Sequence, residues 1–165
     1  MYPGRLILLV GPPACGKSTW RARYLATATR STTVVSSDDV LERFAAEQGL
    51  SYDEAWRTLD SKIVTRTVNE EFDAAVKRAD DIIVDRTNMT AKIRRSFMSR
   101  VPKQTRRIAV LFPIEREELD RRLDARAKET GKYIPKSAVD EMYRIYVAPD
   151  PNDFDEIQTY VPTAG

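Results

Sequence analysis

A glycine-rich segment near the N-terminus carries the most specific chemical pattern in the sequence. Residues 11–18 read Gly-Pro-Pro-Ala-Cys-Gly-Lys-Ser and satisfy the pattern G-x-x-x-x-G-K-[ST]. In this pattern backbone amides surround phosphate oxygens, the lysine reaches the outer phosphates of a nucleotide, and the hydroxyl binds Mg²⁺. The segment therefore predicts a site for ATP and Mg²⁺, with Lys17 catalytic and Ser18 the metal ligand. We expect the nucleotide-binding residues to be Gly11, Pro12, Pro13, Ala14, Cys15, Gly16, Lys17, Ser18 and Thr19.

Two aspartates, Asp38 and Asp39, follow a predicted strand at residues 32–36. Ligands of open parallel sheets bind at the carboxyl ends of the strands, and a carboxylate placed there can accept the proton of an attacking hydroxyl. We interpret Asp38 as the general base and as a substrate contact. The alternative is a structural one, in which Ser37 or Asp38 caps the helix that follows.

A third acidic residue, Asp85, ends the apolar run at residues 82–84. It therefore points toward the phosphates, like the acid that closes a Walker B strand. We predict that the loop beginning here contacts the substrate. The alternative is that Thr87, Asn88 and Thr90 only cap the next helix. The predicted substrate contacts in this loop are Asp85, Arg86, Thr87 and Asn88.

Two arginines, Arg122 and Arg126, are spaced to project from one face of a helix. They precede a polar break at residues 129–133, which we interpret as the tip of a lid spanning approximately residues 122–136. Since a guanidinium can bridge two phosphate oxygens, we expect both to bind the nucleotide and Arg126 to be catalytic. The alternative is ion pairing with nearby acids, namely Glu118, Asp124 and Glu129.

Short apolar runs alternate with segments of helical periodicity along the chain. The runs cover residues 6–10, 32–36, 82–84 and 108–112, and a short one at 157–161 is a candidate last strand. Alternation of strand and helix predicts βαβ crossovers and a parallel sheet with helices on both faces. The expected fold is a three-layer α/β P-loop fold with a helical lid. The length of 165 residues fits one domain, residues 1–165.

Composition removes several chemistries and leaves one charge pattern open. The sequence has no histidine and one cysteine, which excludes Ser-His-Asp and Cys-His catalysis and a thiolate metal cage. The net charge is only +2. The stretch 86–107 nevertheless has eight basic residues and no acidic one. It is either a solvated helix face with strand ends or a flank for a polyanionic substrate.

No targeting or membrane segment is apparent. The apolar run before Gly11 is too short for a signal peptide, and no run has the length to span a bilayer. A lone cysteine, Cys15, fits a reducing compartment. We expect a cytoplasmic protein without membrane contact.

Taken together, these motifs resemble the kinase domain of polynucleotide kinases, both phage-type and repair enzymes, within the P-loop kinase superfamily. The matching pieces cover most of the chain. They are Gly-Pro-Pro-Ala-Cys-Gly-Lys-Ser-Thr-Trp at 11–20, Ser-Ser-Asp-Asp at 36–39, Ile-Val-Asp-Arg-Thr-Asn at 83–88, residues 118–126, Ile134-Pro135 with Met142-Tyr143, and the tail 153–157.

The resemblance implies ATP-dependent phosphorylation of the 5′-hydroxyl of DNA or RNA. It implies that Asp38 is the base, that Lys17 and Ser18 hold ATP and Mg²⁺, and that Arg126 supports the transition state. The family usually has an arginine three residues after the base, where this chain has Leu41. Arg43 or Arg86 is the candidate to replace it. A phosphatase or ligase partner would be a separate chain, and the oligomeric state stays open.

Two other functions fit parts of the same pattern. One is a P-loop kinase of a small molecule, such as a nucleoside, sugar, antibiotic or, as in zeta-toxin-like kinases, a nucleotide sugar. Such an enzyme would not need the acid-free stretch. The other is a nucleotide-binding switch, which would need no base for an acceptor alcohol, so Asp38→Asn would leave it nearly intact.

Overall fold

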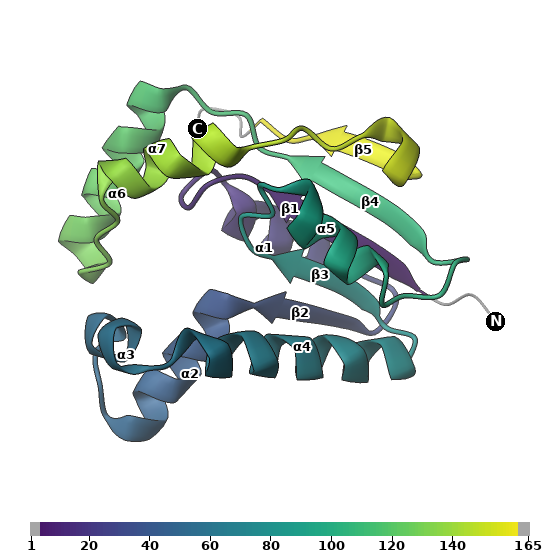
Figure 1. Cartoon of the computed structure of the whole chain (residues 1–165), viewed down its shortest axis with the longest axis horizontal. Helices are drawn as coiled ribbons and strands as arrows, with labels where there is room; N and C mark the ends of the chain where they lie inside the picture. The colour runs from purple at the N-terminus through teal and green to yellow at the C-terminus, as the bar shows by residue number, and fades with distance from the viewer. Residues whose placement is uncertain (1–3, 162–165) are drawn as a thin grey trace.

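The computed structural model describes residues 4–161, which form a parallel sheet of five strands in the order β2-β3-β1-β4-β5 (Figure 1). The central strand β1 is at most 3% exposed from Leu6 to Val10, because helices cover both of its faces. This explains its unbroken apolar sequence and confirms the expected α/β fold. The strands are β1 (Arg5–Val10), β2 (Thr32–Ser36), β3 (Asp81–Asp85), β4 (Arg106–Leu111) and β5 (Glu156–Thr159).

Seven helices and one 3₁₀ turn among the described residues surround the sheet. In Figure 1, α4 and α5 lie on the near face of the sheet and α1 lies behind it. Alternate strand residues follow this division: Leu6 and Leu8 pack with α4 and α5, whereas Ile7 packs on the α1 side. The helices are α1 (Lys17–Thr27), α2 (Ser37–Gln48), α3 (Tyr52–Thr58), α4 (Ser61–Lys77), α5 (Ala91–Met98), α6 (Arg116–Thr130) and α7 (Lys136–Ile145), with the 3₁₀ turn at Pro151–Asp153.

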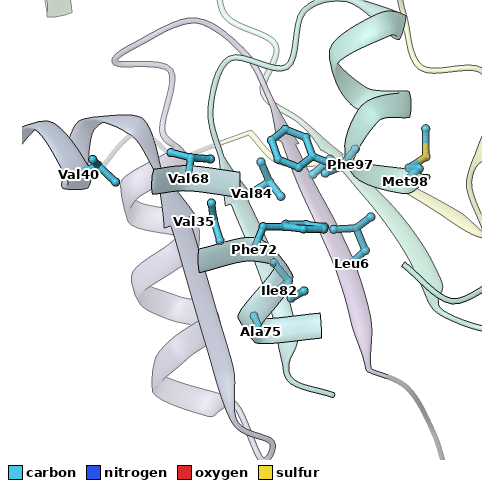
Figure 2. Close-up of a cluster of buried hydrophobic side chains, with 11 residues drawn as sticks. Leu6, Val35, Val40, Val68, Phe72, Ala75, Ile82, Val84, Phe97 and Met98 are labelled. Atoms are coloured by element: carbon cyan, nitrogen blue, oxygen red, sulfur yellow. The ribbon is translucent and has the colours of Figure 1, made fainter. Parts of the chain in front are cut away.

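The larger core lies between the sheet and the two near helices (Figure 2). Phe72 of α4 and Phe97 of α5 meet with ring centroids 5.1 Å apart and cover Leu6 of β1. Burying a large apolar side chain stabilises a fold by about 1.5–3 kcal/mol. This packing fixes the end of the sheet from which the glycine loop, α2 and the loop after Asp85 arise.

Helix α2 begins directly at the end of β2, without an intervening loop. The hydroxyl of Ser36 accepts a hydrogen bond from the Asp39 amide at 3.3 Å, so Ser36 is the cap. This corrects the structural alternative for Asp38, since neither Ser37 nor Asp38 occupies the cap position. The Asp38 side chain can therefore make other contacts.

A short helix that sequence periodicity did not predict, α3, packs against α2. Its first turn is fixed by a capping box, in which Ser51 and Glu54 each satisfy the other's backbone amide. Gly49, with φ of +66°, ends α2 and reverses the chain before α3. Ala55 of α3 then packs on buried Leu41 and Ala45 of α2, so the two helices form one firm unit.

The basic stretch is largely engaged in contacts within the protein. Arg94 is only 2% exposed and donates to the carbonyls of Asn88 at 2.8 Å and Val147 at 2.6 Å. Arg95 and Arg100 pair with acids from other elements, Asp153 and Asp73. The stretch is therefore not a free cationic flank, which favours the structural alternative.

We expect Arg94→Leu to lower the free energy of unfolding by about 2–4 kcal/mol, because it leaves two carbonyls without their charged donor. Arg95→Ala is the matched control. Its ion pair with Asp153 is exposed and 3.4 Å long, so we expect a loss of at most about 1 kcal/mol. Urea unfolding of the three proteins measures both effects, and equal losses would contradict the assignment of Arg94 to the fold.

The two last helices form an arm that packs against the glycine loop. Leu119 and Leu123 of α6 and Val139 of α7 make a separate apolar cluster, which Ala14 of the loop contacts. Gly131, with φ of +72°, ends α6 and begins the turn to α7. None of the helices among residues 4–161 has the length and apolar character that a bilayer-spanning segment needs.

Candidate active site

The glycine loop joins β1 to α1 in a geometry suited to phosphate. Ala14 and Gly16 adopt left-handed backbone angles, with φ of +65° and +113°, which turns successive amides toward one side of the loop. Gly16 begins α1 without a side-chain cap, and the first turn has no acidic residue. The positive end of α1 is therefore left for an anion, as the sequence predicted.

Lys17 lies beneath this loop and is half-buried. Its ammonium donates to the carbonyls of Gly11 at 2.9 Å and Arg86 at 3.3 Å. Burial lowers the pKa of Lys17, while the negative charges of Asp85 and Asp38 oppose this shift. Asp38, Asp85 and the glycine loop all lie at or just after the carboxyl ends of parallel strands, so the predicted phosphate site and the predicted base lie at the same end of the sheet.

Asp38 stands in the first turn of α2 and has a partner on each carboxylate oxygen. The Tyr52 hydroxyl of α3 donates to Oδ1 at 2.7 Å, and Arg126 of α6 lies 3.5 Å from Oδ2. Burial, and then the hydrogen bond to Asp38, raises the pKa of Tyr52, so the phenol remains a donor at neutral pH. The structure thus brings together the predicted base and the predicted catalytic arginine from residues 88 positions apart.

The lid arginines have different partners. Arg122 pairs with Glu118 at 2.9 Å and also donates to the Ala14 carbonyl in the glycine loop at 3.3 Å. The ion-pair alternative therefore applies to Arg122, although this residue also touches the loop. Arg126 instead reaches across to Asp38 and has no ion pair with Asp124 or Glu129 among residues 4–161.

Asp85 ends β3 as predicted, but an arginine that the sequence analysis missed holds it. Arg21 of α1 pairs with Asp85 at 3.0 Å and with Asp39 at 2.7 Å. It therefore fixes the ends of β3 and α2 relative to α1. Its spacing of four residues from Lys17, on the same face of α1, was a signal in the sequence.

The residues after Asp85 have three different environments. Thr87 accepts the Gly11 amide through its carbonyl at 3.0 Å. Asn88 is 1% exposed, and its amide donates to the carbonyls of Leu9 and Val84, so it braces the loop from beneath. The Arg86 side chain is half-buried and makes no hydrogen bond or ion pair with the described part of the chain, and burial lowers its pKa. A partly buried cation without a partner favours an anionic ligand.

Arg43 and Arg86, the candidates to replace the arginine that this chain lacks at Leu41, have different environments. Leu41 is 4% exposed and belongs to the α2–α3 core, so no charged group is possible at that position without repacking. Arg43 is paired with Glu71 of α4. The Arg86 backbone carbonyl accepts from Lys17 at 3.3 Å, and its guanidinium makes no hydrogen bond or ion pair with the described residues. The structure therefore favours Arg86 over Arg43 as the additional anion contact.

Further contacts join the lid tip to the unit formed by α2 and α3, which lies opposite α6 and α7 in Figure 1. Lys132 pairs with Glu42 of α2, and its ammonium lies 4.5 Å from the centre of the Tyr52 ring. Neither contact was predicted, because the partners are 80 to 90 positions apart and no local pattern links them. Together with the contact of Arg126, these contacts hold the lid against α2 and α3, the unit that carries Asp38.

We expect Tyr52→Phe to lower kcat about tenfold, since the Asp38 carboxylate loses a donor that orients it. The control is Tyr133→Phe, which removes the hydroxyl of a residue 71% exposed at the lid tip. Steady-state kinetics with saturating ATP measure both variants. An unchanged kcat in Tyr52→Phe would show that this hydrogen bond does not contribute to turnover.

Several solved structures have a fold similar to that of this chain. A chain of the Pnkp1/Rnl/Hen1 RNA repair complex is similar at 26% identity and a TM-score of 0.70 over 87% of this chain. This protein spans only 44% of that longer chain. The APS kinase CysC of Mycobacterium tuberculosis, solved with AMPPNP and APS, has a TM-score of 0.59 at 15% identity, covering 100% and 92% of the two chains.

A protein from Chloroflexus aurantiacus J-10-fl has a similar fold, with a TM-score of 0.72 at 16% identity over 98% of this chain and 86% of its own. The sheet, the glycine loop and these likenesses agree on a P-loop kinase fold. The AAA_33 family, described as an AAA domain, matches residues 6–149. This match covers most of the sequence, and the chain belongs to that family.

Proposed function

We propose that this protein is a kinase that transfers the γ-phosphate of ATP to the 5′-hydroxyl end of DNA or RNA. The observation that carries the proposal is the contact between Asp38 and Arg126 at the end of the sheet from which the glycine loop also arises. A base for an alcohol, a cation and a phosphate-binding lysine are the groups that such a transfer requires. A nucleotide switch would need no such base.

The residues have separate roles in the proposed reaction. The acceptor oxygen forms its bond to phosphorus as the bond to the ADP oxygen breaks, and Asp38 takes the hydroxyl proton. Lys17 and Arg126 balance charge on the transferring group, while the amides at residues 11–18 orient the phosphates. ATP supplies the phosphoryl group, and the hydroxyl of Ser18, a residue in the first turn of α1, would hold its Mg²⁺.

Two features support a polynucleotide acceptor over a small molecule. The RNA repair chain has the highest identity among the three structures compared above. Arg86, directly after β3, is also left as a half-buried cation without a partner among the described residues, and we propose that it binds the phosphate of an acceptor nucleotide. A sugar or an unphosphorylated nucleoside offers no such anion.

The test is γ-labelled ATP offered with 5′-hydroxyl oligodeoxynucleotides, oligoribonucleotides, nucleosides and sugars in parallel. We expect label on the oligonucleotides, and removal of that label by a phosphatase specific for terminal phosphate. Lys17→Ala is the inactive control. Label on a nucleoside or sugar alone would replace the proposed acceptor, and ATP hydrolysis without any labelled acceptor would contradict the proposal.

A further inference from the structure

An exposed tryptophan, Trp56, lies on α3 without an apparent role in packing. It is 68% exposed and belongs to none of the hydrophobic clusters formed by residues 4–161. Its neighbour one helical turn earlier is Tyr52, whose hydroxyl donates to Asp38. A large exposed ring beside a tyrosine that contacts the proposed base calls for a physical explanation.

The two rings form one surface. Trp56 and Tyr52 have ring centroids 6.5 Å apart and planes inclined by 18°, so they are nearly parallel but offset. An offset of this size leaves most of the indole uncovered, in agreement with its exposure. Lys132 of the lid lies over the Tyr52 ring, 4.5 Å from its centre. The exposed part of the surface is therefore the indole.

The position of this surface is fixed by the fold. Helix α3 has a complete capping box at Ser51, and Ala55 packs into the α2 core, so the rings are held on a firm support. A rigid aromatic group loses little conformational entropy when a ligand stacks on it. These are properties of a binding surface.

A cation lies next to the tryptophan. Arg57 is exposed in the last turn of α3 and makes no hydrogen bond or ion pair within the described residues. It is one residue further along the helix, so its side chain projects about 100° around the axis from that of Trp56. An exposed aromatic ring with a flanking cation is the combination that binds single-stranded nucleic acid, through stacking and phosphate contact.

We infer that Trp56, extended by Tyr52, is a stacking site for a nucleobase of the acceptor strand. The inference rests on the proposed function. Two contacts join the proposed base to the indole: the Tyr52 hydroxyl lies 2.7 Å from Asp38, and the Tyr52 and Trp56 ring centroids are 6.5 Å apart. A strand whose 5′-hydroxyl is at Asp38 therefore places a base near its end over Trp56, with Arg57 beside its backbone.

Steady-state kinetics with a 5′-hydroxyl oligonucleotide test this inference. We expect Trp56→Ala to raise the KM for the oligonucleotide at least about tenfold, because stacking of one base is lost. The KM for ATP and kcat at saturating oligonucleotide should stay within about twofold of the parent values. Trp56→Phe, which retains an aromatic face, should recover most of the affinity.

A spectroscopic test reports on stacking directly. Trp20 and Trp56 are the two tryptophans of the sequence, so Trp20→Phe leaves Trp56 as the single indole. We expect the oligonucleotide to quench its fluorescence, and an oligonucleotide with abasic residues at its 5′ end to quench it less and to bind about tenfold more weakly.

The outcomes separate this inference from the proposed function. If the parent protein phosphorylates oligonucleotides but Trp56→Ala has the parent KM for them, the stacking site does not exist and the function stands. If Trp56→Ala lowers kcat and raises the KM for ATP together, the ring supports the fold of the site instead, which also overturns the inference. If no oligonucleotide is phosphorylated by the parent protein, both proposals fail.

Discussion

We expect Asp38→Asn to lower kcat for phosphate transfer by about a thousandfold, with ATP still bound. A positioned base contributes about 10²–10⁴ in rate, and asparagine keeps the size and hydrogen-bonding shape of the side chain while it cannot take a proton. ATP affinity should be retained because the amides and Lys17, which we propose to hold the phosphates, belong to the glycine loop and the start of α1 and not to α2. Rapid-quench kinetics and calorimetric titration with a non-hydrolysable ATP analogue measure the two quantities.

The neighbouring aspartate is a matched control. Asp39 lies in the same helical turn and is also charged, but its carboxylate pairs with Arg21. Arg21 keeps its second partner, Asp85, when Asp39 is replaced. We therefore expect Asp39→Asn to retain kcat within about threefold, because Asp85 still holds Arg21 and the asparagine oxygen can still accept its hydrogen bond. Equal losses in the two variants would mean that charge on this turn matters, and not a base at residue 38.

Local patterns were sufficient for most of the fold. The run at residues 6–10 is buried on both faces and therefore continuous, and the observed β1 covers it. The last strand, Glu156–Thr159, lies close to the predicted 157–161. Helix α3 was missed because its seven residues are too few to show periodicity, although Ser51 and Glu54 have the spacing of a capping box.

The place of Lys17 and Asp38 in the fold could be predicted, because a motif and a strand end fix it. Their roles in the chemistry stay predictions. The partners of Asp38 were not predictable in the same way. Tyr52 reaches it only because Gly49 reverses the chain between α2 and α3, and Lys132 reaches Tyr52 only because the lid folds across the sheet edge. Such contacts depend on tertiary packing, which local periodicity does not report.

The charge pattern of the sequence did not predict which basic residues have acidic partners. The stretch 86–107 has no acid of its own, yet Asp73, Asp153 and Glu156 supply partners from elsewhere in the chain. Arg94 is a buried donor, whereas the side chain of Arg86 in the same stretch has no partner among residues 4–161. Sequence neighbours with the same charge thus have different tasks, and burial distinguishes them.

We expect Arg126→Ala to lower kcat by about a thousandfold and to raise the KM for ATP by less than about fivefold. An arginine that stabilises charge developing during phosphoryl transfer contributes about 10³–10⁵ in rate and little to ground-state binding. Arg121→Ala is the matched control on the same helix, because Arg121 is 71% exposed and its partner is Glu118. We expect its kinetics to match those of the parent protein within about twofold. A pure KM effect of Arg126→Ala would contradict a transition-state role.

The contact with Asp38 allows a second explanation, in which Arg126 acts only by holding the base. A double-mutant cycle separates the two. If Arg126 only positions Asp38, its removal should have no further effect once Asp38→Asn has removed the base. If Arg126 stabilises the transferring phosphate, Arg126→Ala should still lower the residual rate of Asp38→Asn by tenfold or more, because the charge on that group develops whichever group takes the proton. Complete loss of the Arg126→Ala effect in the Asp38→Asn protein would therefore make Arg126 a positioning residue and leave Lys17 to balance the charge.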